Sequence, residues 1–437
     1  NKATDFRSRL DRVLIHPFWG YVIFFAILLT IFQVIFDWSS IPMDFIDETF
    51  TRLSEATKTN LPPGLFTDLL AEGIIAGLGG IVIFIPQIAF LFLFISVLEE
   101  TGYMSRVVFL MDKSLRKYGL SGKAVIPLIS GTACAIPAVM ATRNIENWKE
   151  RLITILVTPF TTCSARLPVY LILISLVIPE GTFLGIGYQG LTLMGLYLMG
   201  FGMAILSAAI LNKTLKIQSK TYFVIEMPNY KFPLLKNVGI TVFKKTKSFG
   251  VEAGKIILAI SVLLWILASF GPGKNFNNAE EIVTQQMAQQ QPSQEELNTA
   301  IASYKLEHSF IGILGKTVEP AIAPLGYDWK IGIALISSFA AREVFVGTLA
   351  TIYSVGSEEE ETIKNRMAAE LKPNGEALFD LPTGLSLMVF YAFALQCMST
   401  LAIVKKETNG WKWPMVQLFS MTSIAYLSAL TIYQAFA

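Results

Sequence analysis

Hydrophobic residues along this 437-residue chain gather in nine long runs separated by polar segments. A helix needs about 20 mostly apolar residues to cross roughly 30 Å of hydrocarbon, and most of these runs reach that length. The pattern therefore predicts an all-α polytopic membrane protein surrounded by a lipid bilayer. The runs cover residues 18–38, 73–98, 124–142, 152–178, 187–211, 251–270, 330–354, 383–404 and 412–435.

Composition excludes several other classes of protein. Hydrophobic residues make up 53% of the chain and charged residues 16%, whereas soluble domains average about 25% charged residues. A net charge of +2 gives no basis for nucleic-acid binding, and three cysteines cannot form the disulfide framework of a secreted domain. The first run is too long for a cleavable signal peptide. Because the chain begins at Asn1, we expect a processed form or a piece of a longer protein.

The charges of the polar segments predict which side of the membrane each one occupies, because Lys and Arg are retained in the cytoplasm. Segment 213–250 carries eight lysines and one acid, and 99–123 carries five bases and three acids, so both are predicted to be cytoplasmic. Segment 39–72 has six acids and two bases, and is predicted to be external. The same holds for 271–329 and 355–381, each with seven acids and three bases.

Two of the runs do not fit a simple crossing. Pro127, Gly131 and Pro137 interrupt 124–142, and a continuous helix tolerates such residues poorly. If this run enters and leaves from the cytoplasmic side, every later segment falls on its expected side. The same count makes 330–354 a broken or re-entrant element that faces the opposite side.

The two interrupted runs also look like copies of one another, most of the matches lying at an offset of 207 residues. Because charge counting gives the copies opposite orientation, we predict inverted repeats with substrate bound at their interface, as in secondary transporters. The matching stretches are Gly119–Lys123 with Gly326–Lys330, Leu128–Ser130 with Leu335–Ser337, and Cys163–Leu167 with Cys397–Leu401.

All three cysteines lie in apolar runs, beside breaks or polar residues. Cys134, Cys163 and Cys397 are the candidate metal ligands, because thiolates favour transition metals over Mg²⁺ or Ca²⁺. Backbone carbonyls released near Gly131 and Pro137 would line the same path. The alternative is that each cysteine is an ordinary small packing residue, and it stays open here.

A charged pair within run 330–354 is the second candidate. Arg342 and Glu343 would be costly at membrane depth, and such residues by default mark a pathway. Neighbours on a helix point about 100° apart, which makes direct pairing awkward and favours Glu343 as an oxygen ligand. An internal Arg342–Glu343 pair remains the alternative. The only histidines, His16 and His308, fall outside the runs, so a histidine-rich metal cage is not expected.

Eight stretches carry a resemblance to a known family, and they are Arg9–Leu14, Leu98–Arg106, Gly131–Pro137, Cys163–Tyr170, Glu226–Pro233, Arg342–Thr348, Cys397–Leu401 and Glu407–Trp413. In these stretches the chain resembles the membrane portion of the ferrous iron transport protein B family. The resemblance implies two gate-type domains in inverted arrangement, Fe²⁺ uptake through the bacterial cytoplasmic membrane, and an amino-terminal G domain that this chain lacks. One departure lies at Ala133–Pro137, where Ala135 replaces the Asn of the commoner family pattern.

The resulting prediction is two inverted gate-type repeats after one leading transmembrane helix. They would form a permease for a divalent transition-metal cation, with Fe²⁺ as the expected substrate. Its path would be lined by Cys and Glu side chains, and no cofactor would be permanently bound. The segments are an N-terminal helix and external loop over 1–72, a first gate repeat over 73–212, a cytoplasmic connector over 213–250, and a second gate repeat over 251–437 with external insertions at 271–329 and 355–381.

Other functions stay open at this point. They are a Mn²⁺ or Zn²⁺ permease of the same fold, a nucleoside-type transporter, and a membrane signalling module for the G domain. The chain has no phosphate-binding loop and no phosphorylation motif, so we predict a transporter rather than an enzyme, with no nucleotide site. GTP hydrolysis would belong to the G domain, in the full-length protein or as a separate chain. The sequence leaves a homo-oligomer open.

Overall fold

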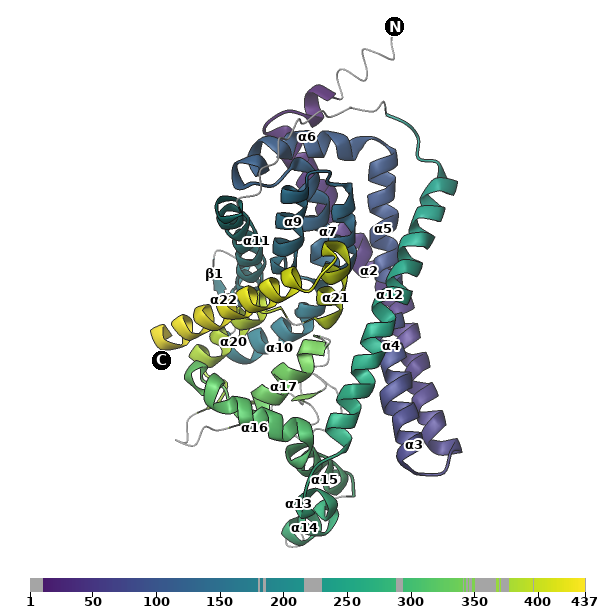
Figure 1. Cartoon of the computed structure of the whole chain (residues 1–437), viewed down its shortest axis with the longest axis vertical. Coiled ribbons are helices and arrows are strands. Elements are labelled where there is room, and N and C mark those ends of the chain that lie inside the picture. The colour runs from purple at the N-terminus through teal and green to yellow at the C-terminus, as the bar shows by residue number, and fades with distance from the viewer. Residues whose placement is uncertain are drawn as a thin grey trace. The chain divides into compact units, whose positions relative to one another are not determined.

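The chain is almost entirely helical in a computed structural model (Figure 1). Within the described residues, seven helical segments are long and apolar enough to cross a membrane, which confirms the predicted all-α polytopic class. Run 124–142 is not among the seven, and run 330–354 contributes only the shorter helix Trp329–Phe339. The structure describes residues 11–436 except 180, 184–185, 216–229, 288–293, 341, 343–344, 346–347, 350–366, 369, 371–376 and 396.

The chain divides into two compact units, and each draws on both halves of the sequence. A boundary between the units falls directly after Cys163. Unit 1 comprises Asn1–Cys163, Phe201–Leu258 and Ala402–Trp413, and unit 2 comprises Ser164–Gly200, Ala259–Leu401 and Pro414–Ala437.

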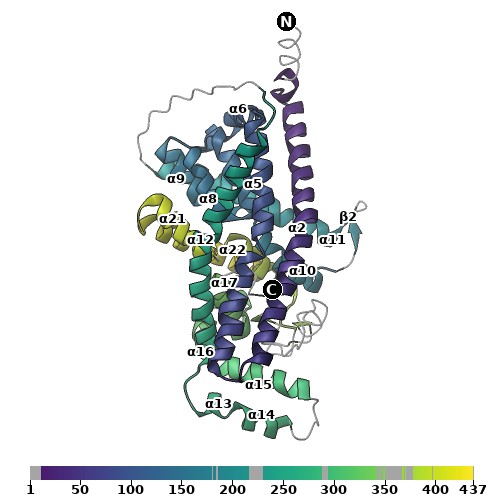
Figure 2. The ribbon, with the colours of Figure 1, turned by 90° about the vertical axis from the view of Figure 1, so that its right-hand side faces the viewer.

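Unit 1 begins with a helical hairpin. Helix α2 runs without interruption from Trp19 to Asn60, so most of the segment predicted as an external loop, 39–72, is helical instead. The second arm packs along α2, as Figure 2 shows, and Gly79 lies against the Phe50 ring. This packing of arm on arm explains how α2 continues beyond the apolar run. The second arm consists of α3 (Leu65–Asp68), η1 (Leu69–Ile75), α4 (Ala76–Val82) and α5 (Ile85–Glu100).

The next part of unit 1 is built from short helices. Cys134 adopts an extended backbone with φ −154° and ψ 134°, which separates α7 from α8 and confirms the predicted interruption of run 124–142. Pro137 falls in the first turn of α8, where the missing N–H has no helical partner to lose. The elements are α6 (Tyr103–Leu115), η2 (Arg116–Tyr118), η3 (Gly122–Ala124), α7 (Val125–Ala133), α8 (Ala135–Ala141), η4 (Thr142–Asn144), α9 (Trp148–Val157) and η5 (Thr158–Phe160).

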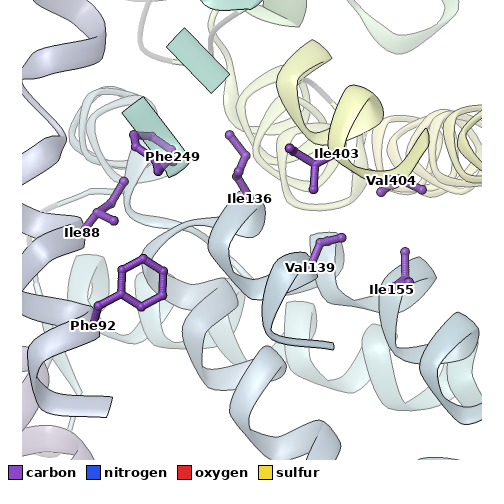
Figure 3. Close-up of a cluster of buried hydrophobic side chains, with 8 residues drawn as sticks. All are labelled: Ile88, Phe92, Ile136, Val139, Ile155, Phe249, Ile403 and Val404. Carbon is purple, nitrogen blue, oxygen red and sulfur yellow. The ribbon is translucent and has the colours of Figure 1, made fainter. Parts of the chain in front are cut away.

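An apolar cluster forms the core beneath α8 (Figure 3). Burying one such side chain fully contributes about 1.5–3 kcal/mol. Its members come from five helices, of which α12 and α21 are distant from α8 in sequence, so this core holds the short α8 in place. They are Ile88 and Phe92 of α5, Ile136 and Val139 of α8, Ile155 of α9, Phe249 of α12 (Leu235–Ser269), and Ile403 and Val404 of α21 (Met398–Thr408).

Unit 2 has a core that is partly polar. The Tyr327 hydroxyl lies 2.9 Å from the Ser386 hydroxyl, which donates in turn to the Ala429 carbonyl at 3.1 Å.

The predicted external insertion 271–329 is largely helical. The remaining elements of the chain are η6 (Ser164–Arg166), α10 (Leu167–Val177), β1 (Thr182–Phe183), β2 (Ile186–Gly187), α11 (Tyr188–Thr214), α13 (Lys274–Asn277), α14 (Ala279–Met287), α15 (Gln294–His308), α16 (Phe310–Ile322), η7 (Ala323–Leu325), α17 (Trp329–Ala340), α20 (Leu381–Phe393) and α22 (Lys412–Phe436).

The predicted duplication has a counterpart in the backbone. Gly119 ends η2 with φ +81° and ψ 15°, and Gly326 ends η7 with φ +83° and ψ 15°. Both are left-handed conformations, which favour glycine. At the same offset of 207 residues, α7 ends at Ala133 and α17 ends at Ala340. The two units therefore repeat one local design, and the inverted orientation of the repeats stays a prediction.

Candidate functional site at the helix breaks

The Cys134 break lies between two short helices in unit 1. The Cys134 N–H still donates to the Ser130 carbonyl at 3.0 Å, but the extended backbone at Cys134 stops α7 there. The Ser130 hydroxyl is buried and has no hydrogen-bond partner within the described residues. A half-exposed thiol, a buried hydroxyl and backbone carbonyls therefore meet at one interruption.

A second break in unit 1 carries Cys163. The apolar helix α9 ends at Thr158–Pro159, because proline has no N–H to continue it, and the chain runs extended until Ser164. Thr162 is fully buried, and its hydroxyl has no hydrogen-bond partner within the described residues. This second interruption repeats the combination of a thiol with a neighbouring buried hydroxyl.

The two breaks of unit 1 are packed together through Gly131. A Cβ atom at Gly131 would lie only 2.3 Å from the Thr161 hydroxyl and 3.2 Å from the Thr158 methyl group. No larger residue fits without moving one of the segments. Gly131, predicted as a path residue, is thus the point at which α7 touches the segment that leads to Cys163.

Unit 2 carries the third cysteine at a similar interruption. Helix α20 ends at Phe393, Ala394 is extended with φ −64° and ψ 139°, and α21 begins after Cys397. Ser399 and Thr400 follow, both about 1% exposed, and their hydroxyls have no hydrogen-bond partner within the described residues. Each cysteine of the chain therefore stands at a break with a buried hydroxyl beside it.

Arg342 holds the Cys397 break from the side of α17. The side chain is 5% exposed, and its Nη2 atom donates to the Ala394 carbonyl at 3.0 Å. That carbonyl is one that the end of α20 releases from helical bonding. Glu343 lies outside the described residues, so its predicted role as a ligand and the alternative pairing with Arg342 both stay predictions.

The two cysteine-bearing spans begin in the same way. The Asn147 side chain accepts hydrogen bonds from the first turn of α9, and the Asp380 side chain accepts one from the Thr383 N–H at 2.9 Å on α20. Such capping side chains fix where a helix starts. The break then follows at nearly the same distance from the cap, at Cys163 and at Cys397.

The described residues contain no closed metal site: within them, no three His, Cys, Asp or Glu side chains come together in a way that could hold a metal ion. Pro137 lies in the first turn of α8, three residues after Cys134, and its role in the path stays a prediction. Sequence reasoning missed the hydroxyls, although a Ser or Thr stands within four residues of each cysteine. It also missed the carboxylate of Glu407, which forms salt bridges with Arg143 and Arg151.

Comparison with known proteins identifies the family. The Gate family, described as nucleoside recognition, matches residues 81–176 and 251–411, which is more than half of the chain and includes all three cysteines. The chain belongs to the Gate family. A second profile, the C terminus of ferrous iron transport protein B, matches residues 193–245 of this Gate protein. No solved structure gives a significant match.

Curated relatives of this Gate protein carry one recurring name. A protein of Leptospira interrogans named Fe(2+) transporter FeoB is 43% identical over 98% of the chain and 59% of its own length. A Staphylococcus aureus protein of the same name is 36% identical, again over 98% and 59%. A Porphyromonas gingivalis protein, named as a fusion of Fe(2+) transport protein A and FeoB, is 34% identical over 98% and 51%. The chain thus spans little more than half the length of these relatives.

These matches confirm the resemblance to the membrane portion of ferrous iron transport protein B. With the seven apolar segments in the described residues, they also confirm a multi-pass protein of the bacterial inner membrane.

Proposed function

We propose that this chain is a permease for a divalent transition-metal cation, and that Fe²⁺ is its principal substrate. The observation that carries the proposal is the position of the three cysteines. Cys134, Cys163 and Cys397 all stand at interruptions of apolar helices, each with a buried hydroxyl nearby. The relatives named Fe(2+) transporter FeoB support the choice of metal.

A helix break suits a cation that has to lose part of its hydration shell. In hydrocarbon, backbone carbonyls that no longer bond within a helix are tolerated only in protein or along a polar path. At each break the carbonyls and hydroxyls would replace water oxygens, and the thiolate would supply the softer ligand that separates Fe²⁺ from Mg²⁺ and Ca²⁺. The cation is cargo here, and no resident cofactor is part of the proposal.

Glu343 completes the proposed ligand set as a hard oxygen donor. Arg342, its neighbour, donates to the Ala394 carbonyl, which supports a role for the arginine in stabilising the break. The proposed direction of transport is into the cytoplasm. A cytoplasmic G domain, in the full-length protein or as a separate chain, is the proposed partner and the site of any GTP hydrolysis.

One observation favours a second candidate function. The Gate family is described as nucleoside recognition, so the alternative to a metal cation is a nucleoside-type substrate. Such a substrate calls for several convergent amide and carboxylate groups. The described surroundings of the three cysteines are rich in hydroxyl and apolar groups instead, which favours the metal.

Reconstitution tests the proposal. The purified chain would be placed in liposomes under reducing, anaerobic conditions, and uptake of Fe²⁺, Mn²⁺, Zn²⁺ and uridine would be compared with protein-free liposomes. We expect Fe²⁺ uptake above the blank and uridine uptake equal to it. Faster Mn²⁺ or Zn²⁺ uptake would transfer the function to that metal. Uridine uptake alone would support the nucleoside function, and no uptake of any solute would support a signalling module.

A further inference from the structure

Unit 1 contains a buried carboxylate that the proposed path does not use. The Glu407 side chain is 4% exposed and lies between two arginines. Arg143 donates from Nη2 to Glu407 Oε1 at 2.5 Å, and from Nε to Oε1 at 2.9 Å and Oε2 at 3.1 Å. Arg151 donates from Nη2 to Oε2 at 2.7 Å. We call these three residues the Glu407 clamp.

The clamp lies close in the chain to three of the five helices that form the apolar cluster of Figure 3. Arg143 belongs to η4, directly after α8, Arg151 belongs to α9, and Glu407 lies in the last turn of α21. On their apolar sides, α8, α9 and α21 contribute five of the eight side chains of that cluster. Cys134, at the start of α8, packs against it as well. Polar and apolar contacts therefore hold α8 at both of its ends.

The hydrogen bonds distinguish a clamp from a cation site. Both carboxylate oxygens of Glu407 already accept charge-assisted bonds from guanidinium groups, which are among the stronger hydrogen bonds in proteins. An arriving cation would have to displace two arginines that carry the same sign of charge. A carboxylate at the C-terminal end of a helix is also unfavourable with the helix dipole, and the arginines offset this. The arrangement stabilises structure and does not bind metal.

Helix α8 is short, so its position depends on contacts such as the Glu407 clamp. A helix of seven residues is far too short to be stable by itself, so its place depends on tertiary contacts. The backbone at Cys134 is a non-helical link between α7 and α8, so a shift of α8 changes the orientation of that thiol. Arg143 is the residue that ties the C-terminal end of α8 to α21 through Glu407.

We propose that Glu407 is a positioning residue for the helix break at Cys134. It fixes α8 through Arg143 and thereby sets the orientation and accessibility of the Cys134 thiol. This inference rests on the proposed function for its importance in transport. The positioning itself is measurable without any metal, so its failure and the failure of transport are separate results.

The test is the labelling rate of Cys134 by a polar maleimide, measured on the full chain in detergent in a Cys163→Ser, Cys397→Ser background. We expect Glu407→Gln to raise that rate at least tenfold, because the neutral amide no longer holds both arginines. Arg143→Gln should raise the rate similarly, and the double variant no further, because Arg143 acts through Glu407. The matched control is Glu146→Gln: Glu146 is an exposed carboxylate of the α8–α9 connection that pairs with Lys123 at 3.1 Å. Its labelling rate should equal that of the parent.

Two results would overturn the inference. One is an unchanged Cys134 labelling rate in a folded Glu407→Gln protein. The other is an equal increase at Cys163, measured in a Cys134→Ser, Cys397→Ser background, which would mean general loosening of unit 1. If Glu407→Gln does not fold, Glu407→Asp keeps the charge and withdraws it by one methylene. That variant should label severalfold faster at Cys134, and labelling at the parental rate would contradict the inference.

Discussion

The two units solve one structural problem in different ways. Each must keep interrupted helices inside an apolar environment, where backbone groups released from a helix are costly. At one contact in unit 1 the groups are neutral: Gly131 lets α7 approach the Thr161 hydroxyl, and Cys134 and Cys163 follow shortly after these two residues in the chain. Unit 2 uses a charge, because the buried Arg342 donates to the Ala394 carbonyl at the break before Cys397.

The two kinds of contact differ in how they would affect a bound cation. The breaks of unit 1 offer two thiols, Cys134 and Cys163, with buried hydroxyls near them in the chain. In unit 2 an arginine stands beside the break, and a positive charge there repels a divalent cation unless an acid offsets it. Glu343, the next residue, is the natural candidate for that acid. The comparison therefore predicts that thiols dominate in unit 1 and the carboxylate in unit 2.

The largest effect is expected at the neutral contact. Gly131→Val would place a branched side chain where even a Cβ atom comes within 2.3 Å of the Thr161 hydroxyl. We expect a loss of about 3 kcal/mol or more from overpacking, and no transport. Thermal unfolding and uptake measure both, with Gly202→Val on α11 as control because nothing lies within 4 Å of its added Cβ. In a Gly131→Ala protein, the additional change Thr161→Ala should recover part of the lost stability. Equal melting temperatures and equal uptake in Gly131→Val and Gly202→Val would contradict the contact.

The charged contact should respond less. Arg342→Met keeps an unbranched apolar stem but removes the guanidinium group, so the Ala394 carbonyl loses its donor. An unsatisfied buried acceptor costs about 1–3 kcal/mol, so the melting temperature should fall. Arg52→Met serves as control, because the Arg52 side chain is 75% exposed and pairs within its own helix. An unchanged melting temperature in Arg342→Met would show that the break does not depend on the buried cation.

Glu343→Gln tests whether the Glu343 carboxylate binds the metal. If the carboxylate is a ligand, the variant should bind metal roughly tenfold more weakly, about 1.4 kcal/mol, with a normal melting temperature. Protons compete with metals for such ligands, so wild-type uptake at low metal should fall as the pH drops, and the variant should lose that dependence. A variant that is unstable but binds metal normally would instead assign Glu343 to the neutralisation of Arg342.

The smallest effect concerns Asp328, which caps α17 by accepting from the Ile331 N–H at 2.9 Å. Burial raises the pKa of Asp328 from 3.8 to about 6, although the Ile331 hydrogen bond and Lys330 oppose the shift. Because the folded-state pKa of Asp328 is raised, the contribution of this residue to stability is fully present below pH 3.8 and is lost as the pH rises through about 6. The melting temperature should therefore fall between pH 5 and pH 7.

Asp328→Asn keeps a capping side chain and removes the charge. It should gain about 1 kcal/mol at pH 7 and flatten the dependence between pH 5 and pH 7. Asp380→Asn on α20 tests whether exchanging any capping carboxylate has the same effect. A pH dependence that survives in Asp328→Asn would assign it to another group.

The sequence predicted the breaks better than the contacts across them. Pro127, Gly131 and Pro137 are local features, and together they indicated an interruption of run 124–142; the break falls at Cys134, whereas Pro127 and Gly131 lie within α7. The offset of 207 residues paired Gly119 with Gly326, and both adopt the left-handed conformation. The partner of Arg342 was beyond reach, because Ala394 lies 52 residues away and offers only a backbone carbonyl. The Glu407 clamp joins residues 264 apart in the chain. The helix from Trp19 to Asn60 was underestimated, because tertiary packing extends it beyond its apolar run.

X-ray absorption at the iron edge of the Fe²⁺-loaded chain tests most directly whether the cysteines at the helix breaks contact the cargo. We predict a sulfur shell around iron in the wild-type protein, a weaker shell when Cys134, Cys163 or Cys397 is replaced by Ser, and none in the triple variant. The triple variant should keep its melting temperature and lose uptake. A purely oxygen shell in the wild type, with normal uptake by the triple variant, would contradict the account and make the cysteines packing residues.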